Sequence, residues 1–135
     1  MGLAALDTNV LVRLVVPDQP ELHRRARELL ASPGARFLVC DHAFVELVFV
    51  LERHYRLGRG EIADVVAALV ALENVECRAA TLAEAAAFWE AHPKLSFEDC
   101  LMAEQARAHG AVPLWSFDRK LANQHPAVQE VPLFA

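Results

Sequence analysis

The sequence predicts a single α/β domain in which a mainly parallel sheet is covered by helices on both faces. Short apolar runs alternate with helical patterns along the chain, and helices between buried short strands favour parallel pairing. The 135 residues are 55% hydrophobic and 23% charged, which fits one packed core and argues against disorder. We therefore expect residues 1–135 to form one domain, and we find no internal repeat or linker.

The first strand is expected at Leu3–Leu6, an apolar run. A helix should follow from about Asn9 until Pro17 stops it, because proline cannot continue a helix. Pro20 should open a second helix, which carries apolar residues at helical spacing and ends at Pro33-Gly34.

A second strand is expected at Phe37–Cys40, followed by a helix that Asp41 caps and that runs to Gly58. Gly60-Glu61 should open the next helix, which continues to about Leu72. Val75–Cys77 then predicts a brief strand.

Thr81 and Glu84 have the spacing of a capping box, before a helix that ends near His92-Pro93. Ser96 should start a further helix that ends at Gly110. Strands at Val112–Trp115 and Val131–Phe134 complete the sheet, with a short helix after Asp118 between them.

The composition also indicates which kinds of partner the chain can have. A net charge of -5 argues against broad affinity for nucleic acid but allows a local nucleic-acid site. A mean hydropathy of +0.22 favours apolar surface covered by a partner or a second copy. No apolar stretch reaches the roughly 18 residues of a membrane helix, and the start Met1-Gly2-Leu3 does not resemble a secretory signal, so we expect a cytoplasmic protein.

Three residue types outside the main motifs are expected to be structural or exposed. The cysteines lack the spacing of a disulfide framework or a zinc site, so they are interpreted as small buried residues. Both tryptophans are expected in the core, and the histidines at the surface. These residues are Cys40, Cys77, Cys100, Trp89, Trp115, His23, His42, His54, His92, His109 and His125.

Four carboxylates have positions that suggest function. Asp7 and Asp118 each follow a predicted strand, where ligands bind in parallel α/β folds, and Asp99 lies in the first turn of a helix. Glu46 lies in the apolar run Ala43–Leu51, where an unpaired charge would be costly to bury. Glu98 adjoins Asp99, but adjacent helical residues point about 100° apart, so we choose Asp99.

Each acid also has a purely structural explanation. Asp7 and Asp118 could be helix N-caps, and Asp99 could complete a capping arrangement with Ser96. Glu46 could form a buried ion pair with Arg13 or Arg53. His42 has the spacing to share the helix face of Glu46 as a metal-binding pair, but an exposed histidine at the helix start is the favoured interpretation.

Carboxylates gathered in one crevice would repel one another unless a cation held them. An oxygen-only ligand set suits Mg²⁺ or Mn²⁺ better than zinc. Such an ion can activate water and offset charge on a phosphoryl group. The conjunction of four acids therefore favours phosphodiester hydrolysis.

The chain resembles the PIN domain family, and within it the VapC-type toxin ribonucleases. The resemblance covers the whole chain and rests on Leu6-Asp7-Thr8-Asn9-Val10-Leu11, on Glu46 in Val45-Glu46-Leu47, on Asp99 in Phe97–Ala103 and on Asp118 in Ser116–Leu121. It implies a three-layer α/β/α sandwich and a Mg²⁺- or Mn²⁺-dependent endoribonuclease. It also implies a cognate antitoxin protein and a homodimer.

By the same resemblance, Asp7 and Asp99 bind the metal directly, and Glu46 and Asp118 complete the site. Thr8, Asn9 and Ser116 would be supporting polar groups, although turn and cap chemistry explains them equally well.

Arg13, Arg119 and Lys120 lie close in sequence to the acids and are candidates for contact with RNA phosphates. Solvated helix faces explain Arg119 and Lys120 as well. Arg13 is the better candidate because it is the one charge in Val10–Val16, so we expect it either to pair with an acid or to reach the crevice.

Other functions of an α/β domain with these acids differ in the residues that they require. A haloacid-dehalogenase-type phosphotransferase needs an aspartate at position 9, where this chain has Asn9, and a receiver domain needs paired acids that are absent here. A PIN-like module that binds RNA or protein without cutting it stays open as the main alternative. The sequence also leaves open a nuclease that is not part of a toxin pair.

Overall fold

The structure, a computed structural model, describes residues 2–133 and contains seven helices and five strands in that range. Its contacts cluster in two compact units, one up to Ala79 and one from Ala80 onward. In chain order the elements are β1 (Leu3–Ala5), α1 (Thr8–Val15), α2 (Pro20–Leu30), β2 (Arg36–Leu38), α3 (Asp41–Arg53), α4 (Arg59–Val70), β3 (Val75–Glu76), α5 (Ala79–Ala91), α6 (Phe97–Ala108), β4 (Leu114–Ser116), α7 (Arg119–Gln124) and β5 (Val128–Glu130).

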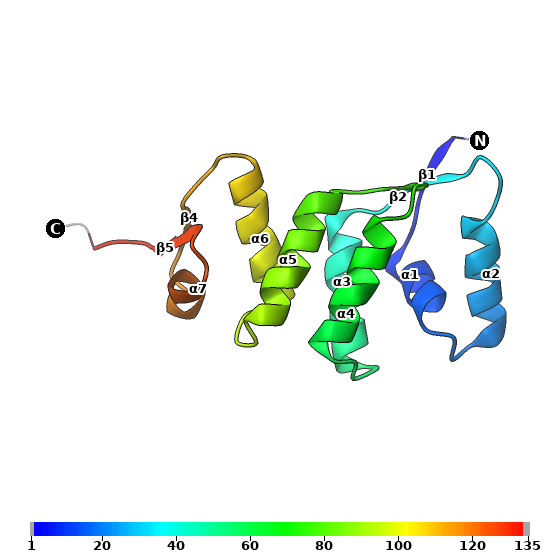
Figure 1. Cartoon of the computed structure of the whole chain (residues 1–135), viewed down its shortest axis with the longest axis horizontal. Coiled ribbons are helices and arrows are strands. Elements are labelled where there is room, and N and C mark those ends of the chain that lie inside the picture. Colours follow the sequence, from blue (N-terminus) through cyan, green and yellow to red (C-terminus); the bar gives the residue numbers. More distant parts are fainter. Residues whose placement is uncertain (1, 134–135) are drawn as a thin grey trace. The chain divides into compact units, whose positions relative to one another are not determined.

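The first unit is built on a three-stranded sheet in the order β1-β2-β3, and both strand pairs are parallel. Figure 1 shows the helices that connect these strands. In the second unit β4 and β5 also pair in parallel, with Ser116 opposite Glu130. The predicted fold class, an α/β protein with parallel strands and helical connections, is confirmed.

Burial of β1 differs from the expectation of a buried strand. Leu3, Ala4 and Ala5 are exposed, and burial starts at Leu6, which is 7% exposed. The core of the first unit lies instead between helices, where Phe44, Leu47 and Ile62 are fully buried. Helix packing therefore supplies most of the apolar burial in this unit.

The boundaries of α3 also correct the sequence analysis. Asp41 was expected to cap the helix, but it is the first helical residue and Cys40 occupies the N-cap position. The helix ends at Arg53, because Arg56 adopts a positive φ of 56° and breaks the helical path before Gly58. Helix α4 then starts at Arg59, where Glu61 accepts a hydrogen bond from the Gly58 N–H at 3.2 Å.

The second unit contains one predicted cap that forms and one that does not. Ser96 caps α6, and its Oγ accepts a hydrogen bond from the Asp99 N–H at 3.1 Å. Thr81 is instead inside α5, which begins at Ala79. Alanine has the highest helix propensity, so Ala79 and Ala80 extend the helix upstream of the expected capping box.

The last strand lies at Val128–Glu130, three residues before the predicted Val131–Phe134, of which Phe134 is outside the described residues. The pairing with β4 sets this position, because the Leu114 N–H donates to the Ala127 carbonyl at 2.7 Å. Pro132 has no N–H and cannot extend the ladder.

Expectations for the cysteines were right only for Cys100, which is buried, whereas Cys77 is half-buried and Cys40 is exposed. Burial, and next the Asp41 charge, raise the pKa of the Cys77 thiol, which disfavours its reactive thiolate form. Trp89 lies in the core as predicted, but Trp115 is 54% exposed.

One histidine clearly departs from the expected surface position. His125 is 1% exposed because its ring packs beside Phe88 and bonds to Glu104. His23 and His92 are half-buried, whereas His54 and His109 are exposed as expected. Within residues 2–133 there is no helix both long and apolar enough to cross a bilayer.

Candidate active site

Asp7 lies at the N-cap position of α1. It follows Leu6, which comes directly after the last residue of β1. Its carboxylate does not cap the helix, and it makes no hydrogen bond or ion pair with any described residue. Capping therefore fails to explain why an acid occupies this position. The positive end of the helix dipole still favours a negative charge there, and the exposed carboxylate is available to a ligand.

Glu46 lies in the second turn of α3, and its side chain is 51% exposed. The structural alternative for Glu46, a buried ion pair with Arg13 or Arg53, is therefore wrong. The apolar neighbours that suggested burial, such as Phe44 and Leu47, lie on the opposite, core-facing side of the helix. Glu46 Oε1 instead contacts Nε2 of His42 one turn earlier, and His42 is exposed as predicted.

In the first unit, Asp7 and Glu46 lie on the helices that follow two neighbouring strands or at the start of such a helix. They follow the carboxyl ends of β1 and β2, which are adjacent and parallel, and helices α1 and α3 pack on each other. The carboxyl ends of parallel strands share one edge of a sheet. The two acids therefore come from elements that leave the same edge.

Asp99 and Asp118 lie in the second unit, both at helix starts. The backbone N–H of Asp99 binds Ser96, while its half-buried carboxylate has no bonded partner among residues 2–133. Asp118 is different, because its Oδ1 accepts a hydrogen bond from the Leu121 N–H at 3.1 Å. The capping explanation is thus realised for the Asp118 side chain and not for that of Asp99.

The three supporting residues lie beside these acids. Ser116 accepts a hydrogen bond from the Asp118 N–H at 2.9 Å, which fixes the turn between β4 and α7. Thr8 is 7% exposed, and Asn9 is exposed on α1. Only Ser116 therefore has a positioning contact with one of the four acids.

Two of the three RNA-contact candidates are engaged in ion pairs. Arg13 binds Asp18 at 3.2 Å, and Arg119 binds Glu130 at 3.1 Å. Lys120 is exposed in the first turn of α7. The contact of Arg13 with an acid was one of the two outcomes expected for it.

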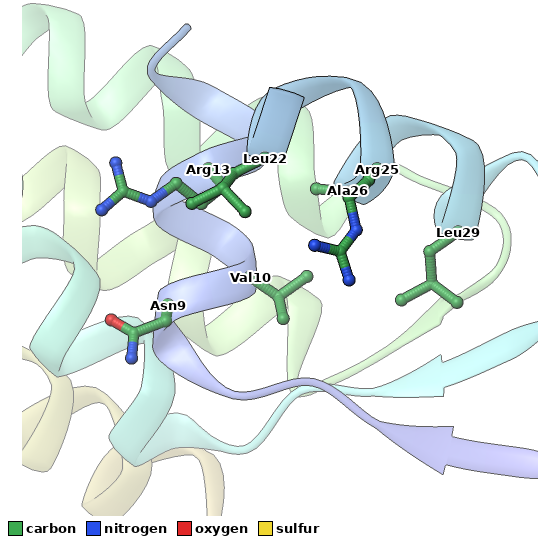
Figure 2. A pocket seen from close by; sticks show the side chains of 7 residues that line it. All are labelled: Asn9, Val10, Arg13, Leu22, Arg25, Ala26 and Leu29. Atoms are coloured by element: carbon green, nitrogen blue, oxygen red, sulfur yellow. The ribbon is translucent and has the colours of Figure 1, made fainter. Parts of the chain in front are cut away.

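A pocket of about 600 Å³ lies between α1 and α2, and Arg13 and Asn9 both line it. Figure 2 shows side chains from both helices around this pocket, including the guanidinium group of Arg25 and the apolar side chains of Val10 and Leu29. Arg25 has no hydrogen bond or ion pair with the described residues. Sequence reasoning missed Arg25, because only the packing of α2 on α1 brings it to the pocket that Arg13 also lines.

Comparison with protein families identifies the chain. The family model of the PIN domain matches residues 4–124, which is most of the sequence. The chain belongs to the PIN domain family. Among curated proteins, none matches this PIN domain closely enough to be reported as a relative.

Membership confirms the resemblance at the family level and the corresponding three-layer fold class. PIN domains are nuclease-type modules that bind RNA and typically use divalent metal ions. The donor set of this PIN domain fits such an ion chemically, because all four acids offer hard oxygen ligands. Among residues 2–133, no three His, Cys, Asp or Glu side chains form a group that could hold a metal.

Proposed function

We propose that this PIN domain is a metal-dependent endoribonuclease that hydrolyses RNA phosphodiester bonds with Asp7, Glu46, Asp99 and Asp118. The observation that carries the proposal is that the carboxylates of Asp7 and Asp99 have no bonded partner among the described residues. Both carboxylates lie at helix starts. Carboxylates without a protein partner at such positions are suited to an external cation.

In this proposal Asp7 and Asp99 bind Mg²⁺ or Mn²⁺ directly, while Glu46 and Asp118 complete or orient the ligand shell. When bound, the ion would supply positive charge to the phosphoryl group and acidify a nearby water. The chain itself orients the acids: the helix starts fix Asp7 and Asp99, and Ser116 fixes the turn that carries Asp118. Glu46 is held by the contact of its Oε1 with Nε2 of His42.

The RNA backbone would be held by cations near these acids. Arg13 and Arg25 line the pocket beside Asn9, two residues from Asp7, and Lys120 is two residues from Asp118. Arginine forks suit phosphate oxygens, and the apolar side chains of Val10 and Leu29 could contact a base or ribose.

We further propose that the chain acts as the VapC-type toxin of a type II toxin–antitoxin pair, in the cytoplasm and as a homodimer. What supports a protein partner is exposed apolar surface, including Phe49, which is 58% exposed on α3. A second pocket of about 560 Å³, lined mostly by apolar residues on and beside α1, α2 and α4 and also by Arg27 and Asn74, offers further surface of this kind. The antitoxin and the second copy are proposals that rest on the family resemblance.

The direct test is cleavage of an end-labelled RNA of mixed sequence with Mg²⁺, with Mn²⁺ and with chelator. We expect cleavage only with metal, and a loss of at least about 100-fold in Asp7→Asn and Asp99→Asn. Asp64→Asn, a change of an exposed acid on α4, is the matched control and should cut normally.

If the folded wild type, freed of any bound inhibitor, cuts no RNA with either metal, the proposal is wrong. RNA binding that persists without cutting would then favour the non-catalytic PIN-like module.

A further inference from the structure

The second unit contains a buried charged side chain that the proposed reaction does not use. Glu104, in the middle of α6, is 3% exposed, and its Oε2 atom has no hydrogen-bond partner among residues 2–133. Its Oε1 atom lies 3.1 Å from Nε2 of His125, a residue that is 1% exposed, and at the longer distance of 3.8 Å from Nη1 of Arg107 on the same helix. An apolar side chain would fill this helix face at lower cost, so the carboxylate calls for an explanation.

The hydrogen bonds of His125 define how the ring is protonated. Its Nδ1 accepts a hydrogen bond from the Ala127 N–H at 3.0 Å, so Nδ1 carries no hydrogen. The hydrogen therefore lies on Nε2 and is donated to Glu104. The ring is neutral and is packed against Phe88 of α5, with ring centroids 4.3 Å apart.

These bonds connect the elements that carry two of the four acids. Glu104 lies on α6, the helix of Asp99, and His125 is the C-cap residue of α7, the helix that Asp118 starts. Ala127 immediately precedes β5, which pairs with β4 on the other side of the Asp118 turn. The bonds thus link α6 to both ends of the segment that holds Asp118.

Helix α7 needs such an anchor because it has only six residues. A helix that short is unstable by itself, so its place depends on what holds its ends. Asp118 holds the first turn through Leu121, and the His125 N–H donates to the Leu121 carbonyl at 2.9 Å in the last turn. Displacing the His125 ring would therefore disturb the turn that orients Asp118.

We propose that Glu104 and His125 are positioning residues, which hold α6 and α7 so that Asp99 and Asp118 keep their working arrangement. This inference rests on the proposed nuclease function. According to this inference, the buried pair of Glu104 and His125 raises kcat for RNA cleavage as well as stabilising the fold. Neither residue touches RNA or metal in this account.

The test compares Glu104→Leu, His125→Phe and the double variant with the wild type, at a temperature where all are folded. We expect kcat for RNA cleavage to fall about tenfold or more, because small displacements of catalytic groups are costly, while KM changes little. The kcat of the double variant should be no lower than that of either single variant, since each single substitution already removes the bond between Glu104 and His125.

Two further variants show whether a change in kcat comes from the lost hydrogen bond or from the lost negative charge. Glu104→Gln keeps an oxygen that accepts the Nε2 hydrogen and should retain kcat within about threefold. Glu90→Gln removes an exposed carboxylate on α5 and should leave kcat unchanged. A Glu104→Leu protein that melts earlier yet keeps the wild-type kcat would reduce the pair to a structural role and overturn the inference.

A measurement on the wild type covers the case in which Glu104→Leu does not fold. Nitrogen NMR of the His125 ring should show a hydrogen on Nε2 and none on Nδ1 at neutral pH. The opposite tautomer, with the hydrogen on Nδ1, would show that Nε2 does not donate to Glu104, and the inference would fail.

Amide exchange separates this inference from the proposed function. Faster exchange at Leu121 in Glu104→Leu is expected even if the wild type cuts no RNA. If the wild type cuts RNA and the variant shows neither faster exchange nor slower cleavage, only the positioning role is refuted.

Discussion

At the residue scale, Asp7 and Asp118 occupy the same kind of position and use their carboxylates differently. Both are N-cap residues, but only Asp118 accepts a hydrogen bond from its helix. Position in the sequence predicted both placements correctly and could not distinguish the two uses. That distinction depends on side-chain rotamers, which the sequence pattern does not determine.

The double use of Asp118 predicts that its two roles can be separated. Asparagine caps a helix about as well as aspartate, so Asp118→Asn should keep the stability of the wild type. The loss of charge should still lower RNA cleavage about 10- to 100-fold. Asp118→Ala should lose the same activity and also about 1 kcal/mol of unfolding free energy in urea. Equal stability of the two variants would contradict the capping role.

His125 predicts a dependence of stability on pH. Burial lowers its pKa in the folded chain, with Arg107 and His92 acting in the same direction and Glu104 opposing them. In the unfolded chain the pKa is about 6.5, so below that pH the unfolded chain binds more protons at this residue. Its contribution to stability is therefore present above about pH 6.5 and is lost on acidification.

Urea unfolding of the wild type and of His125→Phe at several pH values checks this dependence. The wild type should be the more stable protein at pH 8, and its advantage should shrink as the pH falls below about 6.5. A constant difference across that range would mean that His125 has the same pKa in both states.

At the element scale, the order and type of the helices and strands followed from the apolar periodicity, while several boundaries did not. Helix α5 extends to Ala79 because of alanine propensity, and β5 lies earlier because its pairing with β4 fixes it. Glu46 shows the same limit. Its apolar neighbours made it look buried, yet the face of α3 on which it lies is exposed.

The pocket between α1 and α2 predicts a contribution of Arg25 to RNA binding. Arg25→Gln should weaken binding and lower the slope of log affinity against log salt by about 0.7, the value for one phosphate contact on a single strand. The measurement uses an Asp99→Asn background, so that the RNA stays intact.

Arg24→Gln is the matched control for Arg25. Arg24 lies on the same helix but is already bound to Glu21 and Glu28, at 2.6 and 2.7 Å. If the two substitutions change the salt slope equally, the pocket has no specific role in holding RNA.

At the scale of the whole molecule, the order of the four acids along the chain predicted the family, and the family match covers residues 4–124. The expectation of one domain stays a prediction, as does the grouping of all four acids. The Glu104–His125 pair and Arg25 could not be predicted, because each depends on which helix faces meet. Such contacts between elements leave no periodic signal in the sequence.

The most direct test of the central claim is a calorimetric titration of Mn²⁺ into the wild type, Asp7→Asn and Asp99→Asn, with Asp64→Asn as control. It does not require knowledge of the RNA target. We predict that the wild type and Asp64→Asn bind the ion, and that each of the other two binds it at least about tenfold more weakly. Wild-type affinity in both Asp7→Asn and Asp99→Asn, or no binding by the wild type, would contradict a metal site built on these acids.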